Sequence, residues 1–179
     1  MNLIQYMKTY NIILFIILLS LVSVVFSQEI RNGFEITTRE DSFLFPDDIV
    51  TDFSDLNMSQ YKGYPRNKDG KEIVNPFSTF SSKEKLKIIE CELYSAEEQT
   101  VLRNNYNMRA TVVISASTGK IVSAMFSFDN LPDASTIDTL KLQELLERLK
   151  AEITYKNLTF DGHKAASGFM AGSIWFFKS

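Results

Sequence analysis

The sequence predicts a single exported α+β domain, in which a small antiparallel sheet carries one main amphipathic helix on one face and the N-terminal third is irregular. Three patterns lead to this prediction. Residues 12–26 are almost entirely apolar, residues 109–128 alternate as a β-hairpin does, and a one-sided apolar stripe runs from Leu142 to Ile153.

The apolar run has the layout of a secretory signal peptide, which we assign to residues 1–27. One charged residue, Lys8, precedes the run, and Ser27 ends it with a compact side chain suited to peptidase cleavage. We expect cleavage near Ser27 and Gln28, which would release a soluble periplasmic or secreted protein. Residues 12–26 are too few for the roughly 20 that a membrane-spanning helix needs, and an uncleaved N-terminal anchor is the alternative.

Residues 28–80 are predicted to be a loop-rich N-terminal part of the same domain, lying across a core formed by residues 81–179. Glycine, proline and aspartate punctuate this part. Residues 34–38 alternate weakly and predict a short strand. Residues 68–71 predict a turn, because Gly70 accepts the positive φ that such a turn requires.

The core opens with two predicted elements. Residues 86–93 have β-strand character, which would place Cys91 on an apolar, buried face. Ser95 and Glu98 have the spacing of a capping box. We therefore expect a short helix over residues 95–104.

A β-hairpin is the next predicted element. Residues 109–116 alternate apolar and polar side chains, and residues 120–128 return with the same period. The connecting turn ends at Gly119, which can take the left-handed conformation of a bulged hairpin.

The main helix follows the hairpin, and Asp133 or Ser135 is the expected cap. Its apolar positions recur at helical spacing and predict one buried face. These positions are Leu142, Leu145, Leu146, Leu149 and Ile153.

The chain is predicted to close with a strand over residues 169–177, after a turn at residues 161–163. Residues 174–177 are continuously apolar, and this pattern is typical of a central strand that is buried on both faces.

From Arg109 onward, the order of hairpin, helix, turn and apolar strand resembles the C-terminal domain of the TonB family. The similarity rests on residues 112–114, the return at 119–122, the helix over 140–149, and Gly162 before residues 174–177. The resemblance implies a small exported sheet with a helix on one face, which touches other proteins through a sheet edge. The proline-rich spacer of TonB proteins is missing here. The general make-up also resembles uncharacterised exported proteins of Bacteroidetes.

The two side chains best suited to nucleophilic catalysis are Cys91 and His163, the sole cysteine and the sole histidine. A reactive thiol needs positive surroundings, whereas Cys91 lies between two glutamates and is predicted to be a core residue. His163 lies in a polar turn and is predicted to be a surface residue. A Cys91–His163 dyad is the catalytic alternative.

An acidic stretch offers candidate metal ligands in Asp47, Asp48, Asp52 and Asp55. Their spacing does not fit an EF-hand loop, so we expect a solvated acidic loop without a bound metal. A zinc site needs more histidine or cysteine than this chain has. No phosphate-binding loop or serine nucleophile motif is present, and no cofactor is predicted.

The net charge of −3, with both signs interspersed, argues against nucleic-acid binding. Two N-glycosylation triplets, at Asn57 and Asn157, matter only in a eukaryote. We expect a non-catalytic exported domain that binds a protein, peptide or glycan, in an oligomeric state that the sequence does not indicate. The alternatives are a small secreted hydrolase that uses Cys91 with His163 or an acid pair, and a structural component of an envelope assembly.

A binding domain is expected to have an exposed sheet edge or apolar patch. A hydrolase is expected to have a concave pocket that gathers His163 with Cys91 or with several acids.

Overall fold

The structure is a computed structural model that describes residues 29–41, 48–73, 77–80, 82–160 and 163–178. Its main feature is a six-stranded antiparallel sheet in which consecutive hairpins lie side by side. In spatial order, the strands are β1 (Glu29–Arg31), β2 (Phe34–Asp41), β3 (Asp48–Asp55), β6 (Ile121–Asp129), β5 (Arg109–Ser115) and β9 (Phe169–Trp175).

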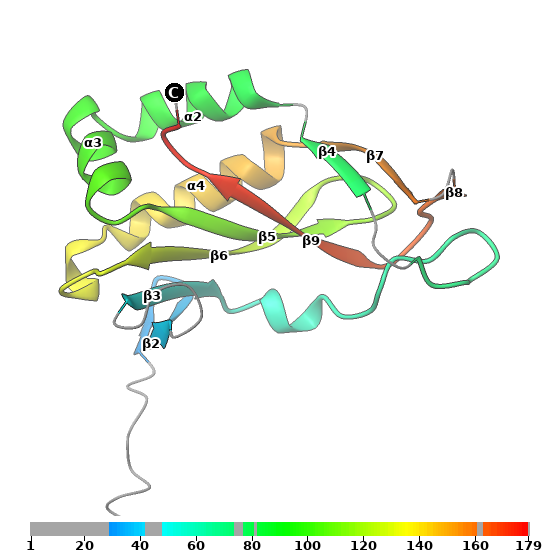
Figure 1. The fold of residues 1–179 in the computed structure, drawn as a ribbon, viewed down its shortest axis with the longest axis horizontal. Coiled ribbons are helices and arrows are strands. Elements are labelled where there is room, and N and C mark those ends of the chain that lie inside the picture. The colour runs from blue at the N-terminus through cyan, green and yellow to red at the C-terminus, as the bar shows by residue number, and fades with distance from the viewer. Residues whose placement is uncertain (1–28, 42–47, 74–76, 81, 161–162, 179) are drawn as a thin grey trace, which may run out of the picture.

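The helices of the described residues gather on one side of this sheet (Figure 1). They are α2 (Lys83–Leu93), α3 (Ala96–Asn104) and α4 (Thr139–Glu152). The short 3-10 turns η1 (Met58–Gln60) and η2 (Ala134–Thr136) lie in the connections after β3 and before α4. A small second sheet contains β4 (Phe77–Phe80), β7 (Tyr155–Phe160) and β8 (His163–Lys164). The predicted α+β class of a single domain is confirmed, and α2 and α3 add to the one main helix expected.

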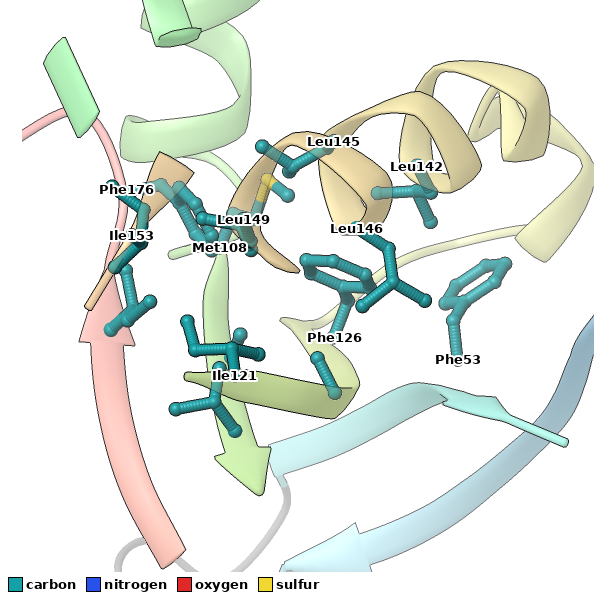
Figure 2. Packing of buried hydrophobic residues seen from close by; sticks show 14 of the residues in the cluster. Phe53, Met108, Ile121, Phe126, Leu142, Leu145, Leu146, Leu149, Ile153 and Phe176 are labelled. Carbon is teal, nitrogen blue, oxygen red and sulfur yellow. The ribbon is translucent and has the colours of Figure 1, made fainter. Parts of the chain in front are cut away.

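The core lies between α4 and the main sheet (Figure 2). All four leucines of the predicted stripe are buried, with Leu142, Leu145 and Leu149 fully so. They meet an aromatic layer in which Phe53 of β3 lies directly opposite Phe126 of β6. Burying a large apolar side chain contributes about 1.5–3 kcal/mol to stability, so this layer holds the helix on the sheet.

The predicted hairpin forms as β5 and β6, and Gly119 ends its turn with a φ of 73°. Any side chain at Gly119 would collide with the backbone of Tyr155, whose oxygen lies 2.2 Å from the position of a β-carbon. The predicted helix at residues 95–104 also forms, as α3. Its capping box is complete, because Ser95 Oγ accepts from the Glu98 N–H and Glu98 Oε2 accepts from the Ser95 N–H.

The N-terminal part contains more strand than the one or two short strands expected within its loops. Its first half forms β2 and β3, two eight-residue strands paired along their whole length, and β3 also pairs with β6. Acidic residues are normally depleted in strands, but the buried Asp52 and Asp55 of β3 accept hydrogen bonds from serines of β6. Hydrogen-bond donors that are distant in the sequence therefore make buried aspartates possible in β3.

Residues 86–93 are helical, in α2, and the strand prediction was wrong. The buried positions are Leu86, Ile89 and Glu90, which is a helical spacing with a glutamate in its apolar face. Ile88 points to solvent and is 53% exposed. Because Glu90 is buried and Ile88 is exposed, the apolar residues of this segment do not recur at helical spacing in the sequence.

Two local details also differ from prediction. The cap of α4 is Asp138, whose Oδ1 accepts from the N–H groups of Leu140 and Lys141, while Asp133 caps η2. The C-terminal strand β9 is an edge strand of the main sheet, and the central position predicted for it was wrong. Trp175 on this strand is 43% exposed.

The predicted signal peptide, residues 1–27, lies outside the described residues. Within the residues that the structure describes, no helix has the length and apolar character needed to cross a membrane.

Candidate functional site

The free edge of β9 carries the candidate site. In an antiparallel pair, alternate residues of a strand direct their N–H and C=O groups toward the neighbour, and the residues between them direct theirs away. The Ala116 N–H donates to the Gly168 carbonyl at 2.9 Å, and the Phe176 N–H donates to the Met108 carbonyl at 3.3 Å. Even-numbered residues along β9 therefore face β5. The residues whose backbone groups point toward the open edge are Ala171, Ser173 and Trp175.

This edge is closed at both ends. The Phe169 N–H donates to the Gly63 carbonyl at 3.1 Å, and the Phe177 N–H donates to Glu90 Oε1 at 2.9 Å. Between these two closures, no backbone hydrogen bond joins the three outward-facing residues to any described residue. The open stretch of β9 is therefore short and has defined limits.

A groove of about 460 Å³ runs between α2 and this open stretch. We call it the β9 groove, and its polar and aromatic lining residues are Lys83, Glu84, Lys87, Glu90, Ser173, Trp175 and Lys178. Leu86 and Ile174 also line it and are largely buried. The groove thus combines unpaired strand backbone with apolar side chains and lysines.

Trp175, the only tryptophan of the chain, is the large aromatic group of the groove. The Lys178 Nζ lies 4.0 Å from the centre of its ring, and the Arg109 guanidinium carbon lies 5.9 Å from it. Cations over an aromatic face are attracted by its negative potential. Two cations therefore lie near the Trp175 ring, which remains partly open to solvent.

Glu90 is the buried acid of the groove. Burial raises the pKa of its carboxyl, and the Phe177 N–H and the charge of Lys87 partly offset this rise. The hydrogen bond to Phe177 fixes the chain where it leaves β9 with a φ of 57° at that residue. Glu90 therefore positions the end of the open edge.

Most charges of α2 run against its helix dipole. Lys83, Lys85 and Lys87 occupy its N-terminal half, with Glu84 as the acid of the first turn, while Glu90 and Glu92 occupy its last turns, where no basic residue is present. Helix dipoles favour the opposite arrangement, by about 0.3–1 kcal/mol for a charge in the first or last turn. Glu90 and Glu92 have partners, in the Phe177 N–H and in Arg148. Among the described residues, none of the three lysines forms an ion pair within 4 Å, although the charge of Lys85 acts on Glu152 and that of Lys87 on Glu90.

At its other end, β9 borders a larger cleft of about 720 Å³, lined by Tyr61, Tyr64 and Phe169 among others. The segment that forms its wall is rigidly attached, because Arg66 exchanges backbone hydrogen bonds with residues 166–167. Gly168 must be a glycine here, since its φ is 85° and a β-carbon would lie 2.2 Å from the Tyr64 carbonyl oxygen.

A third cavity, of about 340 Å³, lies between α3 and α4. Lys141 crosses its mouth, with its Nζ 2.5 Å from Glu98 Oε1 and 5.5 Å from the centre of the Tyr94 ring. Burial is the largest cause of the raised pKa of Tyr94. The nearby carboxylates of Glu98, Asp138 and Glu144 raise it further. The polar groups of this cavity are thus largely engaged with one another.

The predicted metal candidates have structural partners where the structure describes them. Asp52 Oδ1 accepts from Ser127 Oγ at 2.6 Å, and Asp55 Oδ2 accepts from Ser123 Oγ at 2.8 Å. These two aspartates are buried, so the expected solvated acidic loop is wrong for them. The side chains of Asp47 and Asp48 lie outside the described residues. Among the residues described, no three acids, histidines or cysteines gather to hold a metal ion.

The thiol candidate is placed differently from prediction. Cys91 is exposed in the last turn of α2, so its expected burial in the core is wrong. The backbone of His163 belongs to β8, and its side chain lies outside the described residues. The end of α2 that leads into α3 and strand β8 lie on opposite sides of Figure 1. The structure does not bring Cys91 and His163 together.

Sequence reasoning missed the residues of the β9 groove. Three lysines at the start of a helix, against the helix dipole, were the available signal. That signal became visible only once residues 83–93 were known to be helical.

The fold defines an α+β protein in which helices cover one face of a six-stranded antiparallel sheet. Among solved structures, the chain is similar to the crystal structure of a DUF5043 family protein from Bacteroides uniformis ATCC 8492. The two share 14% identity over 83% of this chain and 84% of that chain, with a TM-score of 0.53. At this identity, the likeness shows the fold alone. No protein-family model matches the chain, and no curated protein matches it.

The similarity to a Bacteroides protein agrees, at the level of fold, with the expected likeness to proteins of Bacteroidetes. The resemblance to the TonB C-terminal domain gains no support from this match.

Proposed function

We propose that the protein is an exported, non-catalytic binding domain that takes up an extended peptide segment of a partner as an added strand on β9. The observation that carries this proposal is the open stretch of β9 between its two closures, where the backbone groups of Ala171, Ser173 and Trp175 point outward and have no backbone partner among the described residues. Ser173 and Trp175 also line the β9 groove. Strand addition gains affinity from main-chain hydrogen bonds and selectivity from the flanking side-chain pockets.

The dimensions suit a short segment. From Phe169 to Trp175, β9 extends about 20 Å at the rise of a β-strand. A guest of about seven residues fills this length. Its alternate side chains would face the groove and the lysines of α2 on one side, and solvent on the other.

The place of action is part of the proposal. The apolar run of residues 12–26 supports export. A peptide-binding domain of this kind would then meet its partner in the periplasm or at the cell surface.

Amide hydrogen exchange tests strand addition directly. The probes are capped seven-residue peptides of alternating valine and polar residues. On binding, the amides of Ala171, Ser173 and Trp175 should exchange more slowly, because their N–H groups gain acceptors.

The decisive variant is Ser173→Pro, which removes an outward N–H. No hydrogen bond to β5 is lost, and the preceding Gly172 tolerates the restriction that proline imposes. Ser173→Ala keeps the backbone donor and is the matched control. Binding should fall at least tenfold in Ser173→Pro and stay unchanged in Ser173→Ala. Equal binding by both variants would show that the edge is not used.

A second candidate function is glycan binding in the cleft of Tyr61, Tyr64 and Phe169. Tyr64 is 68% exposed, and the rings of Tyr61 and Phe169 lie 5.3 Å apart at 64°. Such rings offer flat apolar faces with a polar tip. Titration with neutral oligosaccharides should show binding that Tyr64→Ala abolishes. The exposed Leu140 lies on α4, and Leu140→Ala should leave binding intact. The absence of heat change with every sugar would exclude this candidate.

A further inference from the structure

We infer that the segment bound at the β9 edge is acidic, an inference that rests on the proposed strand addition. Lys83, Lys87 and Lys178 line the β9 groove, whereas its acids are Glu84 and Glu90. Glu90 is buried and already accepts the Phe177 N–H, so Glu84 is the one acid of the lining left to oppose the lysines. A positive groove on a chain of net charge −3 is a local reversal of sign.

The charges of these lysines are available to a ligand. Within the described residues, Lys141 and Lys150 form ion pairs with carboxylates, but Lys83, Lys87 and Lys178 form none within 4 Å. The Lys178 Nζ lies 4.0 Å from the centre of the Trp175 ring, and the charge of Lys87 acts on the buried Glu90 without an ion pair within 4 Å. An acidic side chain placed beside the open strand would therefore find cations that no described carboxylate contacts.

Stability does not explain the position of the lysines. Lys83 is the first residue of α2, where the helix dipole favours acids, and Lys87 lies one turn further on. Residues that oppose local stability without structural compensation are expected at functional sites. Attraction for an acidic ligand supplies a reason for both lysines.

The same charges argue against a second copy of this chain as the guest. Antiparallel pairing of two β9 edges would bring two sets of groove lysines face to face. Like charges at an interface are repulsive, so they select against the wrong partner. A segment bearing glutamate or aspartate at alternate positions complements the groove, and a second β9 edge does not.

The test uses three capped seven-residue peptides in which valine alternates with glutamate, glutamine or lysine. Trp175 is the only tryptophan in the chain, so its fluorescence reports binding at this groove. The glutamate peptide should bind at least tenfold more tightly than the glutamine peptide at low salt, and the lysine peptide should bind weakest. Raising the salt concentration should reduce the differences, because exposed charges are screened.

Charge-reversal variants locate the effect. Lys83→Glu with Lys87→Glu should remove the preference for the glutamate peptide. Lys85→Glu reverses one charge on the same helix, half the charge change of the double variant, but Lys85 is exposed and does not line the groove. Its charge acts on Glu152 instead. This control should keep most of the preference.

The outcomes separate this inference from the proposed function. Equal binding of glutamate and glutamine peptides, abolished by Ser173→Pro, would overturn the acidic preference and leave strand addition standing. Binding of the glutamate peptide that Ser173→Pro leaves intact would overturn strand addition and leave a positive site. No binding of any peptide at millimolar concentration, or sedimentation as a dimer that the Ser173→Pro variant dissociates, would overturn both.

Discussion

Replacing Ser127 with alanine tests whether the acids of β3 are structural. Ser127 Oγ donates to Asp52 Oδ1 at 2.6 Å, and both side chains are about 3% exposed. The substitution leaves one buried carboxylate oxygen without its donor. Hydrogen bonds to charged groups contribute about 1.5–3 kcal/mol. Arg39 Nε still donates to the other oxygen at 2.9 Å, so we expect a loss near the lower end, about 2 kcal/mol.

This loss is large for a domain whose total stability is roughly 5–15 kcal/mol. It corresponds to a fall in Tm of roughly 4–8 °C for a chain of this size. Urea unfolding followed by circular dichroism measures the change in free energy. Ser117→Ala is the control, because Ser117 lies in the exposed hairpin turn, and it should change stability by at most about 0.5 kcal/mol.

A double-mutant cycle with Asp52→Ala, which removes the acceptor, isolates the interaction itself. The coupling energy between Ser127→Ala and Asp52→Ala should be about 1 kcal/mol or more. A loss in Ser127→Ala no larger than that of Ser117→Ala, or a coupling energy of zero, would refute the reasoning. Asp52 would then need another explanation for its burial.

Three further predictions concern the groove and its surroundings. Glu90 has a folded-state pKa above its ordinary value of 4.5, so its contribution to stability is complete below that value and is lost as the pH rises through the folded pKa. Glu90→Gln keeps an acceptor for the Phe177 N–H and does not titrate. In urea unfolding, the free energy of unfolding of this variant should therefore improve relative to that of the natural protein as the pH rises from 4.5 to 7.5. A difference between the two proteins that stays the same at both pH values would contradict this. Gly168→Ala should lower the free energy of unfolding by about 2 kcal/mol or more, and Gly70→Ala by about 1 kcal/mol. Both glycines have positive φ, but only Gly168 is crowded. Equal losses in thermal unfolding would show that the Tyr64 backbone moves to make room. Because Cys91 is exposed, it should react with a thiol reagent in the folded protein at a rate within several-fold of its rate in urea. A reaction that is a hundredfold slower in the folded protein would indicate that Cys91 is buried.

The elements that the sequence predicted correctly have simple periods and local caps. The leucines of α4 and the alternation of β5 and β6 bury one face each, as such patterns require. The capping box of α3 is also a local signal, because Ser95 and Glu98 satisfy each other's backbone. In each of these elements, the residues that create the recognisable pattern lie close together in the sequence.

The elements that were missed depend on distant partners. The acids of β3 are tolerated because Ser123 and Ser127 lie opposite them on β6. The apolar run at the C-terminus resembled a central strand, yet it ends an edge strand and then turns, with the Phe177 ring packing 5.5 Å from that of Tyr94. One sequence cannot show which distant residues will meet.

The candidate site was missed for the same reason. The β9 groove joins Lys83 and Lys87 to Trp175 and Lys178, from opposite ends of the core region. Sequence reasoning anticipated an exposed sheet edge in general terms, from the TonB resemblance, but not which strand would form it. The position of β9 at the edge follows from its pairing with β5 alone.

The two closures of β9 also bear on how the protein survives at high concentration. An exposed edge strand is a template on which identical chains can stack without limit, as they do in amyloid. Here the Gly63 carbonyl and the Glu90 carboxylate occupy the ends of that template. Stacking would need a long, flat, continuous edge, whereas the open stretch of β9 is short and limited at both ends. The two closures that delimit the proposed peptide site would therefore also limit the stacking of identical chains on β9.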